Sequence, residues 1–156
     1  MLLDSIKNDL KIAMKAKDTL KISTLRMITS SIKNMEISNR GSSNEDSPND
    51  TLGDSEIIQL LSKMIKQRKE SAEIYSKSNR NDLEKKENDE IEIIEQYMPS
   101  QINDDEIDKL INEIIDETGS SSIKDMGRVM TILKEKYSGQ MDFGKASLIV
   151  KEKLNS

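Results

Sequence analysis

Few residue types in this sequence could do acid–base or nucleophilic chemistry. Its 156 residues include no cysteine and no histidine, so thiolate nucleophiles, imidazole bases and the usual zinc ligands are excluded. Ser71 has no base to activate it, because Lys69 lies two positions away and does not share its helix face. Carboxylates, lysines and tyrosines remain. We expect no catalytic residue, no metal site and no cofactor, and thus no activity of the chain alone.

A run of carboxylates is the first candidate for a two-metal or paired-acid site. Its members are Glu84, Glu87, Glu90, Glu92 and Glu95. A carboxylate-bridged metal bundle also uses Glu-x-x-His pairs, and the sequence has no histidine. The run therefore indicates a solvated acidic helix face.

Arg68 and Glu87 differ from the other charged residues because each falls within a stripe of apolar residues. A charged group at such a position is stable only with a partner. We predict a structural network of Arg68 and Glu87, a partly buried ion pair that ties two helices together. A ligand-binding role for the same residues is the alternative.

Positive charge collects at the carboxyl-terminal end of an acidic chain. The net charge is −5, yet residues 119–156 carry seven cations against four carboxylates, whereas residues 81–118 carry three against fourteen. Spacing places Lys124 and Arg128 on one helix face. Such cations bind nucleic-acid phosphates or form an ordinary solvated surface. The candidate nucleic-acid-binding residues are Lys124, Arg128, Lys134 and Lys145.

Aromatic residues make up only 3% of the chain, so no stacking platform for single strands is evident. A folded RNA held by its backbone and shape suits these cations better. The same scarcity requires a core of Ile, Leu and Met, which suits helices.

The longest helical pattern runs from Glu56 to Pro99. Two apolar stripes with a period of three to four residues are interrupted at residues 79–82, and this predicts a long helical hairpin. Pro99 disfavours helical geometry at Met98, so the second helix ends near there. We place a domain boundary at this proline.

Shorter helices flank the hairpin. The first ends near Lys17, and Asp18 caps a second that ends near Ser38. Residues 39–53 are rich in Ser, Asn, Asp and Gly, which predicts a flexible surface loop, with a switch or binding loop as the sharper reading. Three short helices follow residue 99, the middle one reaching Gly139. Gly127 inside that helix predicts close helix packing, with a ligand-facing backbone as the alternative.

The expected location is cytoplasmic. Residues 1–9 are partly acidic and contain no apolar run of signal-peptide length, and no apolar window is long enough to cross a membrane. The absence of cysteine fits a reducing compartment.

Several motifs in order resemble the YqeY family. They are Leu25-Arg26-Met27, Gln67 to Ser71, Arg80 to Leu83, Tyr97-Met98-Pro99 and Lys124 to Met130, with Gly139, Asp142 and Lys145 near the end. The resemblance implies a helical domain followed by a three-helix domain similar to the tail of the B subunit (GatB) of the glutamyl- and aspartyl-tRNA amidotransferase. It implies contact with tRNA and carries over no catalytic residue. Any link to carbon–nitrogen ligase activity with glutamine as amido donor is inherited from the larger enzyme.

These features predict an all-α protein with an amino-terminal helical domain, residues 1–98, built around a long central hairpin. A small three-helix domain, residues 99–156, follows. We expect a non-catalytic accessory protein that binds tRNA or associates with tRNA amidotransferase or other translation proteins. An adaptor that docks a protein partner through an apolar helix face is the alternative, and an enzyme acting alone comes third.

Overall fold

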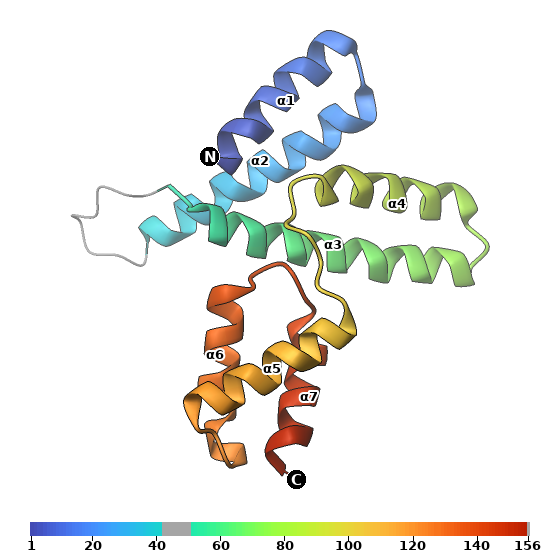
Figure 1. Ribbon diagram of the computed structural model, residues 1–156. Coiled ribbons are helices and arrows are strands. Elements are labelled where there is room, and N and C mark those ends of the chain that lie inside the picture. Colours follow the sequence, from blue (N-terminus) through green and yellow to red (C-terminus); the bar gives the residue numbers. More distant parts are fainter. Residues whose placement is uncertain (42–50, 156) are drawn as a thin grey trace. The chain divides into compact units, whose positions relative to one another are not determined.

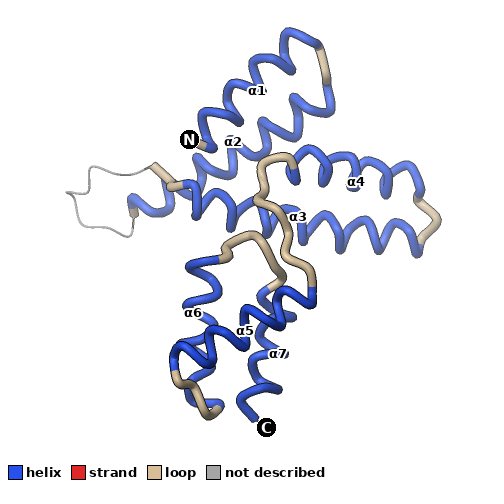
Figure 2. Tube along the Cα trace, viewed as in Figure 1, coloured by secondary structure: helices blue, strands red, loops and turns tan. Residues whose placement is uncertain are grey.

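The computed structural model describes residues 1–41 and 51–155, and all regular structure in those residues is helical (Figures 1 and 2). The all-α prediction is confirmed. The chain divides into two compact units, Met1–Met98 and Pro99–Ser156. The helices are α1 (Leu2–Ala16), α2 (Thr19–Arg40), α3 (Asp54–Lys77), α4 (Asn81–Glu95), α5 (Asp104–Thr118), α6 (Met126–Lys136) and α7 (Phe143–Asn155), with a 3-10 turn η1 (Ile123–Asp125) before α6.

Helices α1 and α2 form the first hairpin of the first unit (Figure 1). Lys17 ends α1 in the left-handed conformation, at φ 57°, and its backbone N–H bonds back to the last turn. Asp18 then starts α2, because its carboxylate accepts a hydrogen bond from the Lys21 N–H at 3.2 Å. The predicted cap at Asp18 is confirmed.

Helices α3 and α4 form the second, longer hairpin, as the two apolar stripes predict (Figure 2). The break falls at residues 78–80, where Asn79 adopts φ 56°. Asp54 in the first turn of α3 accepts a hydrogen bond from the Leu2 N–H at 3.0 Å. This bond ties the start of α1 to the start of α3.

The core of the first unit is built from apolar faces of all four helices and one loop residue. Ile6, Leu25, Ile57 and Ile94 are fully buried in it. Leu52 is also buried, at 3% exposure, and its N–H donates to Glu36 Oε1 at 3.3 Å.

The predicted flexible loop is only partly within the described residues. Asn39 and Arg40 belong to the last turn of α2, so the loop is shorter than residues 39–53. Leu52 is the one apolar residue near its end, and burial of that side chain fixes the chain before α3. The rest of the prediction concerns residues 42–50, which lie outside the described residues.

The second unit packs α5, α6 and α7 around its own apolar core. Asn103 caps α5 by accepting from the Glu106 N–H at 2.9 Å, and Gly119 ends that helix at φ 65°, as predicted. Ile102 N–H donates to the Gln140 carbonyl at 2.8 Å, which links the segment before α5 to the loop between α6 and α7. The middle helix was predicted to reach Gly139, but it ends at Lys136.

Candidate nucleic-acid interface

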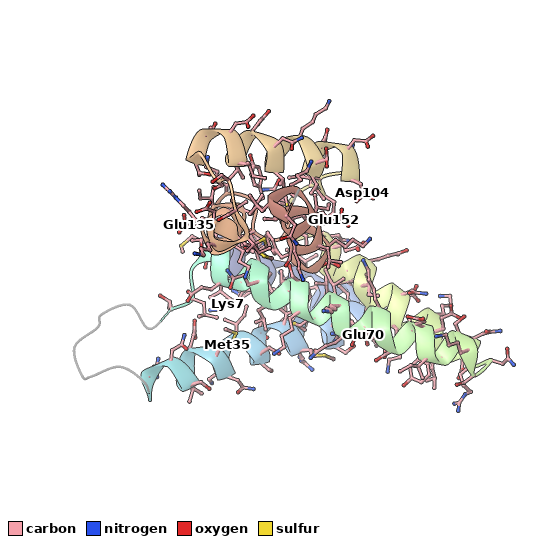
Figure 3. The ribbon with its side chains drawn as sticks, turned by 90° about the horizontal axis from the view of Figure 1, so that it is seen from below. Lys7, Met35, Glu70, Asp104, Glu135 and Glu152 are labelled. Carbon is pink, nitrogen blue, oxygen red and sulfur yellow. The ribbon has the colours of Figure 1, made fainter. Side chains whose placement is uncertain are left out.

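Three of the four predicted cations lie on one side of the η1–α6 segment. Val129 in α6 is buried. Gly127 precedes it by two residues, and at about 100° per residue it lies about 160° round the helix, on the side away from the core. We name this side the α6 outer face, and its residues are all exposed: Lys124, Gly127, Arg128, Thr131 and Lys134. Helix periodicity places Arg128 at one edge of this face, with Glu135 two turns further along the same edge. Glu135 is labelled in Figure 3.

The turn before α6 holds the start of this face in place. Asp125 accepts hydrogen bonds from the backbone N–H groups of Ser121 and Ser122, at 3.0 and 3.2 Å. These two bonds, helped by the nearby Arg128 charge, lower the pKa of the Asp125 carboxyl below its ordinary value. The carboxylate is therefore occupied by backbone donors beside Lys124 and Arg128.

Gly127 contradicts the prediction of close helix packing. Outside the helix's own backbone, no described atom would lie within 4 Å of a Cβ built at this position. Gly127 is exposed, and its φ is not positive. Neither a neighbouring helix nor an unusual backbone conformation requires glycine here, because the residue faces away from the core.

The fourth predicted cation, Lys145, lies on α7. It is exposed, and Leu148, three positions further along, is 64% exposed on the same side of that helix. Among the described residues, the side chains of Lys124, Arg128, Lys134 and Lys145 form no ion pair or hydrogen bond. By contrast, Lys153 of α7 pairs with Asp108 of α5 at 3.0 Å.

Charge is segregated among the helices of the second unit. Helix α5 carries seven carboxylates and one lysine, whereas η1 and α6 together carry four cations and two carboxylates. Helix α7 carries three lysines and one glutamate. The acidic residues of α5 start at Asp104 in the first turn (Figure 3). A polyanion therefore meets favourable potential at α6 and α7 and repulsion at α5.

The buried charge network of the first unit uses a different carboxylate from the one the sequence suggested. Arg68 Nε donates to Glu90 Oε2 at 2.9 Å, Nη1 donates to the Met64 carbonyl at 3.1 Å, and Nη2 contacts Met27 Sδ at 2.6 Å. Glu87 is only partly buried and has no side-chain partner among the described residues. Glu90 lies one turn further along the same stripe, so helix periodicity alone allowed either residue.

A second polar link in the first unit was missed from the sequence. The Tyr97 hydroxyl donates to Asp9 Oδ2 at 2.6 Å and joins the turn after α4 to α1. Burial, this hydrogen bond and the Asp9 charge all raise the pKa of Tyr97. The two residues are 88 positions apart, and no local pattern connects them.

No set of three or more Asp or Glu side chains in residues 1–41 and 51–155 is arranged to hold a metal ion. Within those same residues, no helix combines the length and the apolar character needed to cross a membrane.

The fold and the surface define an all-helical protein of two compact units whose second unit has a basic face. A family model described as "Yqey-like protein" matches residues 3–154. The chain therefore belongs to the YqeY-like family, as the motifs around Arg68, Pro99 and Gly127 suggested.

Several curated relatives carry the name "Altered inheritance of mitochondria protein 41, mitochondrial". The protein of that name from Vanderwaltozyma polyspora is 34% identical over 157 residues, which cover 95% of this chain and 80% of the relative. The one from Lachancea thermotolerans is 39% identical over 120 residues, which cover 76% of this chain and 60% of the relative. A Saccharomyces cerevisiae relative is 33% identical over 125 residues, which cover 76% of this chain and 63% of the relative. This chain thus spans less than two thirds of the latter two proteins.

These names contradict the expectation of a cytoplasmic protein, because they describe the relatives as mitochondrial. That expectation was based on the absence of cysteine and of an apolar leader. Neither feature distinguishes the cytoplasm from other reducing compartments.

Proposed function

We propose that this protein is a non-catalytic accessory protein that binds tRNA through the α6 outer face and Lys145 of its second unit. The observation that carries the proposal is the set of four exposed cations that form no ion pair or hydrogen bond among the described residues. They lie on η1, α6 and α7, which together carry seven cations against three carboxylates, whereas α5 carries one cation against seven carboxylates. The resemblance of this unit to the tail of the amidotransferase B subunit supports tRNA as the RNA bound.

The aromatic residues of the second unit favour recognition of the RNA backbone over stacking on bases. Tyr137 and Phe143 are partly buried against the apolar core. They therefore offer no exposed platform on which bases could stack. Lysine and arginine side chains contact phosphates without regard to sequence, so a folded RNA presenting its backbone is the fitting ligand.

The names of the relatives support action in mitochondria. A tRNA-binding protein of that compartment would serve its translation machinery, and an amidotransferase acting on charged tRNA is the partner that the resemblance suggests. Cell fractionation with matrix and cytosolic marker proteins tests the compartment. Recovery of the endogenous protein with the cytosolic marker alone would contradict it.

Charge reversal tests the RNA-binding proposal. Lys124→Glu with Arg128→Glu should weaken binding of unfractionated tRNA by about tenfold or more in a gel-shift assay at low salt, because phosphate contacts are lost and replaced by repulsion. Lys63→Glu with Lys66→Glu is the matched control, since these exposed lysines of α3 give the same change in net charge in the first unit. Undetectable tRNA binding by the natural protein, or equal losses in both variants, would overturn the proposal.

A protein-interaction adaptor is the second candidate, favoured by one feature of the first unit. Met14, Thr19, Ile22, Ser23 and Arg26 line an open cleft on the α1–α2 hairpin, and Met14 is 48% exposed. An adaptor would hold a partner such as the amidotransferase core directly. Copurification with and without RNase separates the two functions, because RNase removes an RNA-bridged partner and leaves a directly bound one.

A further inference from the structure

We infer that Gly127 is the point at which the sugar–phosphate backbone of RNA makes its closest approach to this protein. The inference depends on the proposed RNA-binding function and specifies a contact within it. It concerns the bare backbone surface between the cations rather than the cations themselves.

Glycine at position 127 has no explanation within the fold. A glycine inside a helix is less stable than alanine, because it loses more backbone freedom on folding. The usual compensations are a left-handed conformation or close contact with a neighbour. Neither is present at Gly127 among the described residues, since its φ is not positive and the space around its missing Cβ is open.

Gly127 and Thr131 form a strip of the α6 outer face from which no long side chain projects, and we call it the low strip. Thr131 lies one turn further along the helix, and its hydroxyl donates to the Gly127 carbonyl at 2.8 Å, so it is held against the helix. Lys134 follows two turns after Gly127 on the same side. Lys124 and Arg128 are long side chains next to the strip. A strand lying over Gly127 would thus be within reach of three cations.

The charges around the strip favour an anionic backbone over a protein ligand. Lys124, Arg128 and Lys134 have no described ion-pair partner. The Asp125 carboxylate is bound by the N–H groups of Ser121 and Ser122. Glu135, at the edge of the face, forms no ion pair or hydrogen bond through its side chain among the described residues. Phosphodiester groups match this arrangement because each adds one negative charge at regular spacing.

Substitution of Gly127 in the full-length protein tests the inference with a change that should stabilise the fold. Gly127→Ala should raise the melting temperature, because alanine favours the helix and meets no neighbour. It should also weaken binding of unfractionated tRNA by about fivefold, since the added methyl holds the RNA backbone away from the helix. Gly127→Leu should weaken binding further.

Gly41→Ala is the matched control. Gly41 follows α2 with helical φ and ψ of −71° and −14°. Among the described residues, an added Cβ would meet the Ser38 carbonyl at an ordinary 3.6 Å. This substitution adds the same methyl group in the first unit. It should leave tRNA binding unchanged.

The outcomes separate this inference from the proposed function. A more stable Gly127→Ala protein with weakened tRNA binding and an unaffected Gly41→Ala protein is the expected result. Unchanged binding by Gly127→Ala and Gly127→Leu, while Lys124→Glu with Arg128→Glu still weakens it, would overturn the inference and leave the proposed function intact. A lower melting temperature for Gly127→Ala would also overturn it, by showing a structural need for glycine. Absence of tRNA binding by the natural protein would overturn both.

Discussion

In the first unit the Arg68 guanidinium and the Glu90 carboxylate meet in the interior at 2.9 Å, whereas the fully buried residues described in the second unit are apolar. The enclosed hydroxyl oxygen of the half-buried Ser138 has no hydrogen-bond partner among the described residues. The first unit also joins the turn after α4 to α1 through the Tyr97 hydroxyl and Asp9. Paired polar groups of this kind fix which helix turns face each other. The second unit instead leaves four of its cations exposed on the surface: Lys124, Arg128, Lys134 and Lys145. The first unit thus holds a charge pair in its core, whereas the core of the second unit holds none among the described residues.

Removing one member of the buried ion pair should have the largest effect on stability. Glu90→Leu leaves the Arg68 charge without a partner in the interior, and should lower the free energy of unfolding by about 3–5 kcal/mol in urea denaturation. Glu87→Leu is the control on the neighbouring turn, where the carboxylate has no described partner, and should change it by less than about 1 kcal/mol.

A double substitution sharpens the same comparison. Arg68→Met with Glu90→Leu removes both charges and should recover most of the stability lost in Glu90→Leu. Equal stability of Glu90→Leu and the natural protein would show that the pair does not define the packing of the first unit.

In the second unit, stability should depend on apolar volume instead. Leu133 is fully buried, and Leu133→Ala should lower the free energy of unfolding by about 3 kcal/mol through lost burial and a cavity. Leu148→Ala, at a position 64% exposed, should change it by less than about 0.5 kcal/mol. Urea denaturation followed by circular dichroism measures both. Similar values for the two variants would contradict the assignment of the core.

The smallest expected effect concerns Tyr97. Tyr97→Phe removes the hydrogen bond to Asp9 and should cost about 1 kcal/mol. Folding raises the pKa of Tyr97, whereas a tyrosine in an unfolded chain has a pKa of about 10. The phenol therefore contributes its full stability below about pH 10, and this contribution falls as the pH rises further.

Absorbance titration of the tyrosines measures this shift. The natural protein should show one phenol that ionises only at higher pH than an ordinary tyrosine, and Tyr97→Phe should lack it. Tyr75→Phe is the control for stability, since that hydroxyl has no described partner. A late-ionising phenol that persists in Tyr97→Phe would contradict the assignment.

Helix periodicity and capping residues predicted most of the fold. Asp18, Asn103 and Gly119 act as the local sequence indicates, because caps and left-handed stops depend on a few adjacent residues. Periodicity also placed Arg68 on the buried face of α3. It did not choose between Glu87 and Glu90, because that choice depends on the register between α3 and α4.

The sequence did not predict contacts between distant segments or the surroundings of single residues. No local sequence pattern links Asp9 to Tyr97, because they are 88 positions apart. Leu52 was assigned to a polar loop, although its side chain is buried. The glycine at position 127 was read as a packing contact, because a sequence does not show whether a neighbour approaches. The assignment of Lys124, Arg128, Lys134 and Lys145 to RNA binding stays a prediction, as does independent folding of residues 1–98 and 99–156.

The salt dependence of tRNA binding by the full-length protein tests most directly whether the second unit holds RNA by its phosphates. The logarithm of the binding constant should fall linearly with the logarithm of salt concentration, and Lys124→Glu with Arg128→Glu should make this slope shallower by about two phosphate equivalents. The Lys63→Glu and Lys66→Glu control should keep the slope of the natural protein. Identical slopes for all three proteins would contradict binding through the α6 outer face.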